Sequence, residues 1–229
     1  MYPRRVRSMR AAFLLLAGLA GAALGSPAPG GHAAASLTDA VWVAFRCKSD
    51  GGCVKGTAFH VGGGIFYTNA HVAQERNGYG PLTLARGTSP RVTLGTATVV
   101  CLNDRAIDPS GDARPYDVAK ITLHNLSPLP LALQTTRSPP VQHSRVTVIG
   151  YPGASWIPVV ATGTVVERLP FSVFAYTVDT GSVAPGSSGS PVLNYRNEVA
   201  GIHYAGDERG EYQFALTLKF VDQVCKPTN

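Results

Sequence analysis

Short apolar segments separated by turn residues recur along the chain from residue 41 onward. They are rich in valine, isoleucine, threonine and aromatic residues, and glycine, proline, asparagine or aspartate interrupts them. Runs of this kind between turn residues are typical of the strands of a sandwich or barrel. The pattern predicts strands at Val41–Phe45, Gly64–Thr68, Ala97–Val100, Val118–Leu123, Val146–Ile149, Gly163–Val166, Phe174–Val178 and Glu198–Ile202.

Helical patterning is confined to two short stretches. His71–Gln74 favours a single turn, and Leu218–Val224 favours a short terminal helix. Residues 125–142 contain four prolines, which lack the amide donor that a central strand needs. We therefore expect an all-β fold in which 125–142 connects two halves, 36–124 and 143–229.

The first 35 residues have the layout of a secretory signal peptide. Four arginines precede an apolar run, Ala11–Leu24, and small residues follow it. This run is shorter than the roughly 20 residues that a membrane-spanning helix needs. The small-x-small rule favours cleavage before Ser36, and a cut before Ser26 is the alternative; Arg4 and Arg5 also permit a twin-arginine signal. We expect a secreted or periplasmic protein without stable membrane insertion.

The basic character of the chain belongs mostly to this leader. The formal net charge of +6 falls to +2 when residues 1–35 are removed, because they hold four arginines and no acid. The remainder has no run of basic residues, so we do not expect nucleic-acid binding. It also has no calcium loop, nucleotide loop or cofactor motif, and we expect no cofactor.

Four cysteines in an exported chain favour disulfides over free thiols. Three pairings are possible. Cys47 and Cys53 flank a turn-rich segment between two strand-like runs, which makes a bridge across that hairpin the expected local pair. Cys101 with Cys225 then follows by elimination. No C-x2-C or H-x3-H pair occurs, so a zinc site is not expected.

The segment Gly186–Pro191 carries the strongest chemical signal. A tight, glycine-flanked turn can expose a serine hydroxyl and can bring two backbone N–H groups close to one point. These are the requirements for a nucleophile and an oxyanion hole. The alternative for such a composition is a flexible Gly/Ser turn without chemistry.

A histidine and an aspartate complete the pattern. His71 follows an apolar strand in the first half, and Asp117 stands at the mouth of another such strand. Asp104, Asp108 and Asp112 lie in a polar loop, whereas apolar neighbours could bury Asp117 beside an imidazole. The chain order His, Asp, Ser is that of the chymotrypsin group and differs from the orders of subtilisins and α/β-hydrolases.

Four segments resemble motifs of trypsin-like serine peptidases. Gly186–Pro191 resembles their G-x-S-G-G-P motif, and Thr68–Val72 resembles their T-A-A-H-C histidine motif. Tyr116–Ala119 is similar to their D-[IL]-A motif, and Gly56–Phe59 is similar to the strand before the histidine. The resemblance spans nearly all of the chain after the leader.

The resemblance implies a fold and a division of labour. The fold would be two six-stranded antiparallel β-barrels of the chymotrypsin type with a short C-terminal helix. His71 would act as general base, Asp117 would orient it, and Ser188 would be the nucleophile. The N–H groups of Gly186 and Ser188 would form the oxyanion hole, and the substrate would be a protein or peptide.

Within the family, the chain is most similar to glutamyl endopeptidases and to the HtrA protease module. His203, in a G-I-H motif, implies cleavage after Glu, or after Gln as in viral 3C-type proteases. Val183 departs from this, because glutamyl endopeptidases have threonine there and HtrA-like enzymes favour small aliphatic residues. A packed, purely structural His203 is a further alternative.

Two other classes of function compete with the peptidase hypothesis. A catalytically inactive two-barrel protein could bind peptides or carbohydrate, but all three triad residues are present. An esterase or lipase would need the motif G-x-S-x-G, which places a glycine where Ser190 stands. The predicted absence of long helices also argues against that class.

Overall fold

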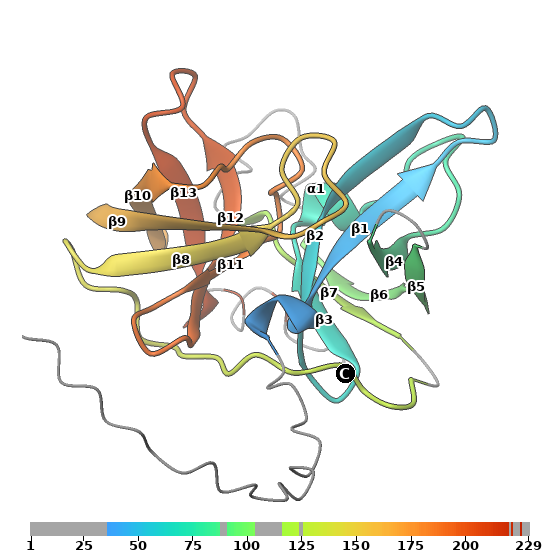
Figure 1. The fold of residues 1–229 in the computed structure, drawn as a ribbon, viewed down its shortest axis with the longest axis horizontal. Coiled ribbons are helices and arrows are strands. Elements are labelled where there is room, and N and C mark those ends of the chain that lie inside the picture. The colour runs from blue at the N-terminus through green and yellow to red at the C-terminus, as the bar shows by residue number, and fades with distance from the viewer. Residues whose placement is uncertain are drawn as a thin grey trace, which may run out of the picture. The chain divides into compact units, whose positions relative to one another are not determined.

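The computed structural model describes residues 36–87, 91–103, 116–123, 126–219, 221 and 225, and β-strands dominate this part of the chain (Figure 1). Each of the eight strands expected from the hydrophobic pattern overlaps an observed strand. The expected signal peptide lies outside the described residues. Within them, no helix combines the length and the apolar character needed to cross a bilayer.

The N-terminal half is a seven-stranded antiparallel sheet in the order β5-β4-β1-β2-β3-β7-β6. Its elements are η1 (Leu37–Ala40), β1 (Val41–Cys47), β2 (Cys53–Gly62), β3 (Ile65–Thr68), α1 (Ala70–Ala73), β4 (Thr83–Arg86), β5 (Val92–Thr96), β6 (Thr98–Leu102) and β7 (Ala119–Thr122). The sheet differs in detail from the expected closed barrel of six strands. The chain bends at Ala97, whose N–H donates to the Leu82 carbonyl, and this corner separates β5 from β6. The two edge strands thus adjoin in sequence without forming a ladder.

The C-terminal half is the expected six-stranded closed barrel, in the order β10-β13-β12-β11-β8-β9. Its strands are β8 (Arg145–Gly150), β9 (Val159–Leu169), β10 (Val173–Thr180), β11 (Pro191–Leu193), β12 (Val199–Gly206) and β13 (Gln213–Thr217). Residues 218, 219 and 221 are helical, in line with the expected terminal helix. The proline-rich connector forms no named strand in its described part, 126–142, and pairs with the barrel through an isolated Thr135–Val199 bridge.

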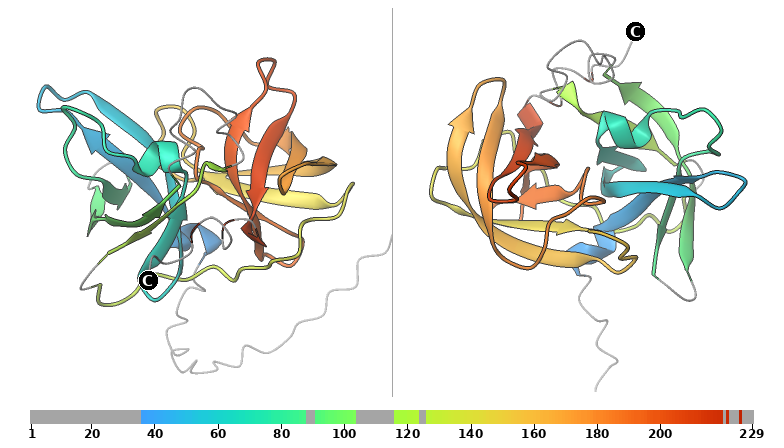
Figure 2. Two further views of the ribbon diagram at one scale, coloured as in Figure 1. Left: turned by 180° about the vertical axis from the view of Figure 1, so that it is seen from behind. Right: turned by 90° about the horizontal axis from the view of Figure 1, so that it is seen from above.

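Three apolar clusters form the core. One lies within the N-terminal sheet around Phe66 and Ile121, and another fills the C-terminal barrel around Phe174 and Val192. The third joins the halves, because it contains β1 and β2 residues such as Phe59 together with residues of the C-terminal barrel. The halves lie side by side in both views of Figure 2. Burial of this shared cluster fixes their relative position.

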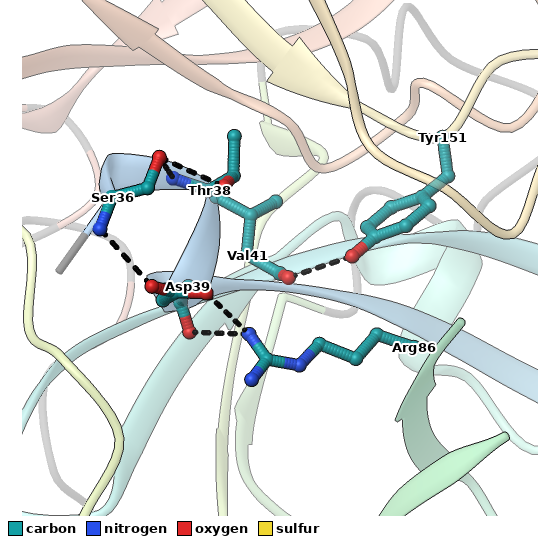
Figure 3. A network of polar contacts seen from close by, with 6 residues as sticks. All are labelled: Ser36, Thr38, Asp39, Val41, Arg86 and Tyr151. Atoms are coloured by element: carbon teal, nitrogen blue, oxygen red, sulfur yellow. Dashed lines mark hydrogen bonds and ion pairs between the residues drawn. The ribbon is translucent and has the colours of Figure 1, made fainter. Parts of the chain in front are cut away.

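A polar network supports the start of β1 and ties it to the C-terminal half (Figure 3). The N–H of Ser36 donates to the Asp39 carboxylate, which also forms a salt bridge of 2.9 Å with Arg86. The hydroxyl of the fully buried Tyr151 donates to the Val41 carbonyl at 2.8 Å. Burial raises the pKa of Tyr151, so the phenol keeps its proton and remains a donor. Tyr151 therefore links the halves through a satisfied buried hydrogen bond.

Both expected disulfides are present. Cys47–Cys53 closes the β1–β2 hairpin, and the two residues are six positions apart. Cys101–Cys225 joins β6 of the N-terminal sheet to the end of the chain, across 124 positions. The second bridge restricts the unfolded chain far more than the first, because the loop that it closes is much longer.

We expect loss of Cys101–Cys225 to destabilise the fold more than loss of Cys47–Cys53. Loop-closure entropy predicts about 5 kcal/mol for the long loop and about 2 kcal/mol for the short one. Urea unfolding of C101S/C225S, with C47S/C53S as the matched control, measures the difference. Equal losses in the two double variants would show that the long loop contributes no additional restraint.

Candidate active site

The serine turn between β10 and β11 depends on two glycines. Gly186 and Gly189 have φ angles of 100° and 89°, a region that side chains disfavour. A Cβ atom at Gly189 would lie 2.0 Å from the Thr57 carbonyl oxygen, and one at Gly186 would lie 2.6 Å from that of Tyr151. The turn can therefore pack this closely against β2 and the loop after β8 only with glycine at both positions.

Two amides of this turn are left free. The N–H groups of Ser187 and Gly189 donate to backbone carbonyls at 2.9 Å. The N–H groups of Gly186 and Ser188, by contrast, make no hydrogen bond to any described residue. These are the two donors that the sequence assigned to an oxyanion hole. Their availability is what such a role requires.

The three serines of the turn differ in their exposure, and Ser188 lines a pocket. Ser187 is 1% exposed, and its hydroxyl accepts a hydrogen bond from the N–H of Ala184 at 3.3 Å. Ser190 is fully buried, and its hydroxyl has no partner among the described residues. Ser188 is partly exposed and faces open space. Burial thus distinguishes Ser188 from its neighbours, which composition alone could not do.

His71 and Asp117 are hydrogen-bonded to each other. His71 lies on α1, which is a single helical turn, and Asp117 precedes β7 by two residues. One carboxylate oxygen contacts His71 Nδ1 at 2.5 Å, and the other accepts the backbone N–H of His71 at 2.9 Å. Asn69 Nδ2 donates to the Asp117 carbonyl at 2.6 Å. Because Asp117 holds both the ring and the backbone N–H of His71, the orientation of the imidazole is fixed.

Strand β2 brings the serine turn to this pair. The N–H of Thr57 donates to the Ser188 carbonyl at 2.7 Å, and Thr57 Oγ1 donates to the Gly186 carbonyl at 2.9 Å. A Cβ at Gly56 would be 3.0 Å from the Ser188 oxygen and 2.5 Å from the side chain of Val72 on α1. The turn and α1 therefore face each other across a residue without a side chain.

The Ser188 hydroxyl itself makes no hydrogen bond to the described residues. Contacts between a nucleophile and its base are often long or poorly aligned in unliganded enzymes. The arrangement supplies a hydroxyl, an oriented imidazole and two free amides, which are the components of acyl transfer. No group of three or more His, Cys, Asp or Glu residues in the described part of the chain is placed to hold a metal ion.

A pocket of about 580 Å³ opens beside Ser188. Both residues expected to contact substrate, His203 and Val183, line it, together with residues 206–210 at the turn between β12 and β13. Gln213 also lines the pocket and is 6% exposed. The sequence analysis missed Gln213, because a lone glutamine at the start of a short strand gives no signal of its own.

His203 is neutral in this pocket. Burial, followed by the charge of His71, lowers its pKa from 6.5 to about 3, and a backbone interaction with Phe214 opposes them only in part. Its Nδ1 lies 3.0 Å from the hydroxyl of Tyr176. Burial raises the pKa of Tyr176, and its hydroxyl has no other partner among the described residues. The phenol therefore donates to Nδ1, which leaves the ring proton on Nε2.

Comparison with known families gives one match. Residues 56–202 match the model of the trypsin-like peptidase domain. This range includes every residue of the His71–Asp117 pair and of the serine turn.

Solved structures with a similar fold include several proteases. The Rv3671c protease of M. tuberculosis in its active form has a TM-score of 0.64 and 22% sequence identity, covering 84% of this chain and 83% of that one. The serine endoprotease of Yersinia pestis gives 0.64 and 19%, covering 82% of this chain and 62% of that one. The HtrA-type protease AlgW with a tripeptide gives 0.62 and 20%, covering 82% and 59%.

The neutral state of His203 predicts an acid-sensitive fold. Between pH 6.5 and about 3 this histidine is protonated in the unfolded chain and neutral in the folded chain. His203 therefore does not lower the free energy of unfolding above pH 6.5. As the pH falls below 6.5 it lowers that free energy, by about 3 kcal/mol at pH 4.5. Urea unfolding at pH 7 and pH 4.5 should show a smaller loss in His203→Gln, with the exposed His143→Gln as control. The same loss in wild type and His203→Gln would contradict this.

Proposed function

The chain belongs to the trypsin-like peptidase domain family and is a serine endopeptidase, and on that basis we propose that His71, Asp117 and Ser188 form its catalytic triad. The observation that carries the proposal is the pair of hydrogen bonds that the Asp117 carboxylate accepts from the backbone N–H and the ring of His71. Because this bond holds the Nδ1 side of the ring, Nε2 is left for the substrate side. The selective exposure of Ser188 among the three serines also supports it.

The proposed mechanism assigns one task to each group. His71 Nε2 takes the proton from the Ser188 hydroxyl as its oxygen attacks the peptide carbonyl, and returns it to the leaving amine. Asp117 keeps the proton on Nδ1 and stabilises the imidazolium. The free N–H groups of Gly186 and Ser188 bind the oxyanion of the tetrahedral intermediate. Each such donor typically lowers the barrier by about 3 kcal/mol.

We propose that the enzyme works after export, in an oxidising compartment. The sequence of residues 1–35 has the layout of a signal peptide. The two disulfides support the same conclusion, because such bonds persist outside the cytosol and are rare within it.

For the residue before the scissile bond, we propose Gln in preference to Glu. A carboxylate in this pocket would face a neutral His203 and the acidic Asp207 and Glu208, with Arg209 as the cation among the lining residues. A neutral amide avoids the cost of burying a charge without a partner, and it can both donate to and accept from polar groups. His203 and Gln213 supply such groups in the pocket wall.

Val183 argues for a different substrate residue before the scissile bond. It lines the same pocket, packs against the core of the C-terminal barrel and cannot donate a hydrogen bond. A pocket whose specificity depended on Val183 would select small aliphatic residues, as the similarity to the HtrA protease module implies.

Ser188→Ala should abolish peptidase activity and labelling by a fluorophosphonate probe without changing the fold. The substitution removes one hydroxyl that makes no hydrogen bond to the described residues, so little packing is lost. Ser187→Ala and Ser190→Ala are the matched controls and should keep both activities. Labelling of Ser188→Ala, beside its loss in either control, would identify a different nucleophile.

Cleavage of a peptide library should show Gln, and more weakly Glu, before the scissile bond. His203→Ala should lower kcat/KM for these peptides by about tenfold to a hundredfold, because a buried group that pairs with the substrate is lost. The profile is read by mass spectrometry of the products. If wild type cuts after Ala or Val and His203→Ala keeps that profile, His203 is structural and the aliphatic preference holds.

A further inference from the structure

Lys55 of β2 reaches across to the C-terminal half. Its ammonium donates to the carbonyl oxygens of Tyr151 and Ser155 at 2.8 and 2.6 Å, in the loop between β8 and β9. No carboxylate lies within salt-bridge distance of Lys55 among the described residues. Burial lowers its pKa, as expected for a partly desolvated cation. Two carbonyls therefore take the place of the counter-ion that such a charge normally has.

The loop that Lys55 holds is bonded directly to the serine turn. The N–H of Gly153, between the two carbonyls, donates to the Pro185 carbonyl at 2.7 Å. A Cβ at Gly186 would stand 2.6 Å from the Tyr151 oxygen and 3.4 Å from Cε of Lys55. The Tyr151 carbonyl that receives the ammonium thus lies against the residue that offers a free N–H.

The same region has a second support from β2. Thr57 Oγ1 donates to the Gly186 carbonyl at 2.9 Å and accepts the N–H of Tyr151 at 3.3 Å. Thr57 therefore holds the carbonyl of Gly186 in place. Lys55 holds the Tyr151–Ser155 loop, which packs against the Cα of Gly186. Without the ammonium, the carbonyls of Tyr151 and Ser155 would lose their donor, and the loop behind Gly186 would be linked to β2 by the Thr57–Tyr151 hydrogen bond without the support of Lys55.

We propose that Lys55 is a positioning residue for the oxyanion-binding turn, acting by holding the Tyr151–Ser155 loop beneath Gly186. This rests on the proposed function, in which the N–H groups of Gly186 and Ser188 bind the oxyanion. The uncompensated charge of Lys55 contributes in the same direction, because a nearby cation stabilises negative charge that develops in a partly desolvated site. Lys55 thereby acts on the transition state and leaves ground-state binding of the substrate unchanged.

The test compares Lys55→Met with Lys55→Arg. Methionine keeps much of the apolar stem and removes the charge and the donors, whereas arginine keeps both with altered geometry. Lys55→Met should lower kcat by about tenfold to a hundredfold with KM unchanged, less than the loss of a direct oxyanion donor. The rate of labelling by a fluorophosphonate probe should fall to a similar degree, because that reaction also places an oxyanion in the site. Lys55→Arg should recover part of both rates.

Lys48→Met is the matched control. Lys48 lies in the same half over the ring of Tyr79, and among the described residues its side chain makes no hydrogen bond to the serine turn. This variant should keep the wild-type kcat and labelling rate.

Three results would overturn the proposal. An unchanged kcat and labelling rate in Lys55→Met would show that the loop needs no ammonium. A raised KM with unchanged kcat would place Lys55 in substrate binding. If Lys55→Met does not fold, Lys55→Gln decides, because its shorter neutral side chain also removes the charge, and wild-type kcat and labelling rate in that variant count against the proposal.

Different results would contradict the triad assignment and the Lys55 proposal. Labelling of the wild type that does not depend on Ser188 would overturn the triad assignment, whatever the Lys55 variants do. Labelling that depends on Ser188 but not on Lys55 would leave the triad intact and reject the positioning role.

Discussion

The hydrogen bond from the Thr57 N–H to the Ser188 carbonyl is the contact on which the arrangement of the site depends. It joins a strand of one half to the serine turn of the other, so the two halves must dock before the candidate nucleophile and base can face each other. Gly56 allows this contact, because any side chain there would meet both Val72 and the Ser188 carbonyl. The shared apolar cluster, which includes Phe59 of β2, and the hydrogen bond from the Tyr151 hydroxyl to the Val41 carbonyl hold the same junction. The backbone of β2 thus determines where the chemistry can occur.

Electrostatics around this junction are asymmetric. Burial keeps His203 uncharged on the side of the large pocket, whereas the ammonium of Lys55 lies beside the turn, with two carbonyls and the ring of Trp156 as its partners. His71 occupies the carboxylate of Asp117, and the other two carboxylates, Asp207 and Glu208, line the large pocket together with Arg209. Negative charge that forms at the substrate carbonyl would therefore meet donors and a cation. Burial favours the neutral form of His203, whereas two carbonyl acceptors stabilise the ammonium of the partly buried Lys55 against the opposing effect of burial.

Much of this could be predicted from the sequence, because local patterns carry it. The strands with β-branched and aromatic runs, the single helical turn at His71 and both disulfides are all present in the structure. The pattern missed β4, β5 and β13, which are four or five residues long, and β5 is largely exposed at an edge. It also missed the open seven-stranded sheet, since the corner at Ala97 depends on a contact with Leu82. Lys55 and Gln213 acquire their roles only from residues distant in sequence, so no local motif could reveal them.

The Cys101–Cys225 bridge has a consequence for the fate of a cleaved molecule. The connector 126–142 is proline-rich and crosses between the halves, and a peptidase could sever it as it could any exposed loop. One cut there would give two chains, the first with His71 and Asp117 and the second with Ser188. The bridge spans that cut, because Cys101 precedes the connector and Cys225 follows it. In a nicked molecule the disulfide would therefore keep the two fragments covalently linked and at a high effective concentration. Such a molecule could retain an assembled site. Reduction of the disulfide would let the fragments dissociate.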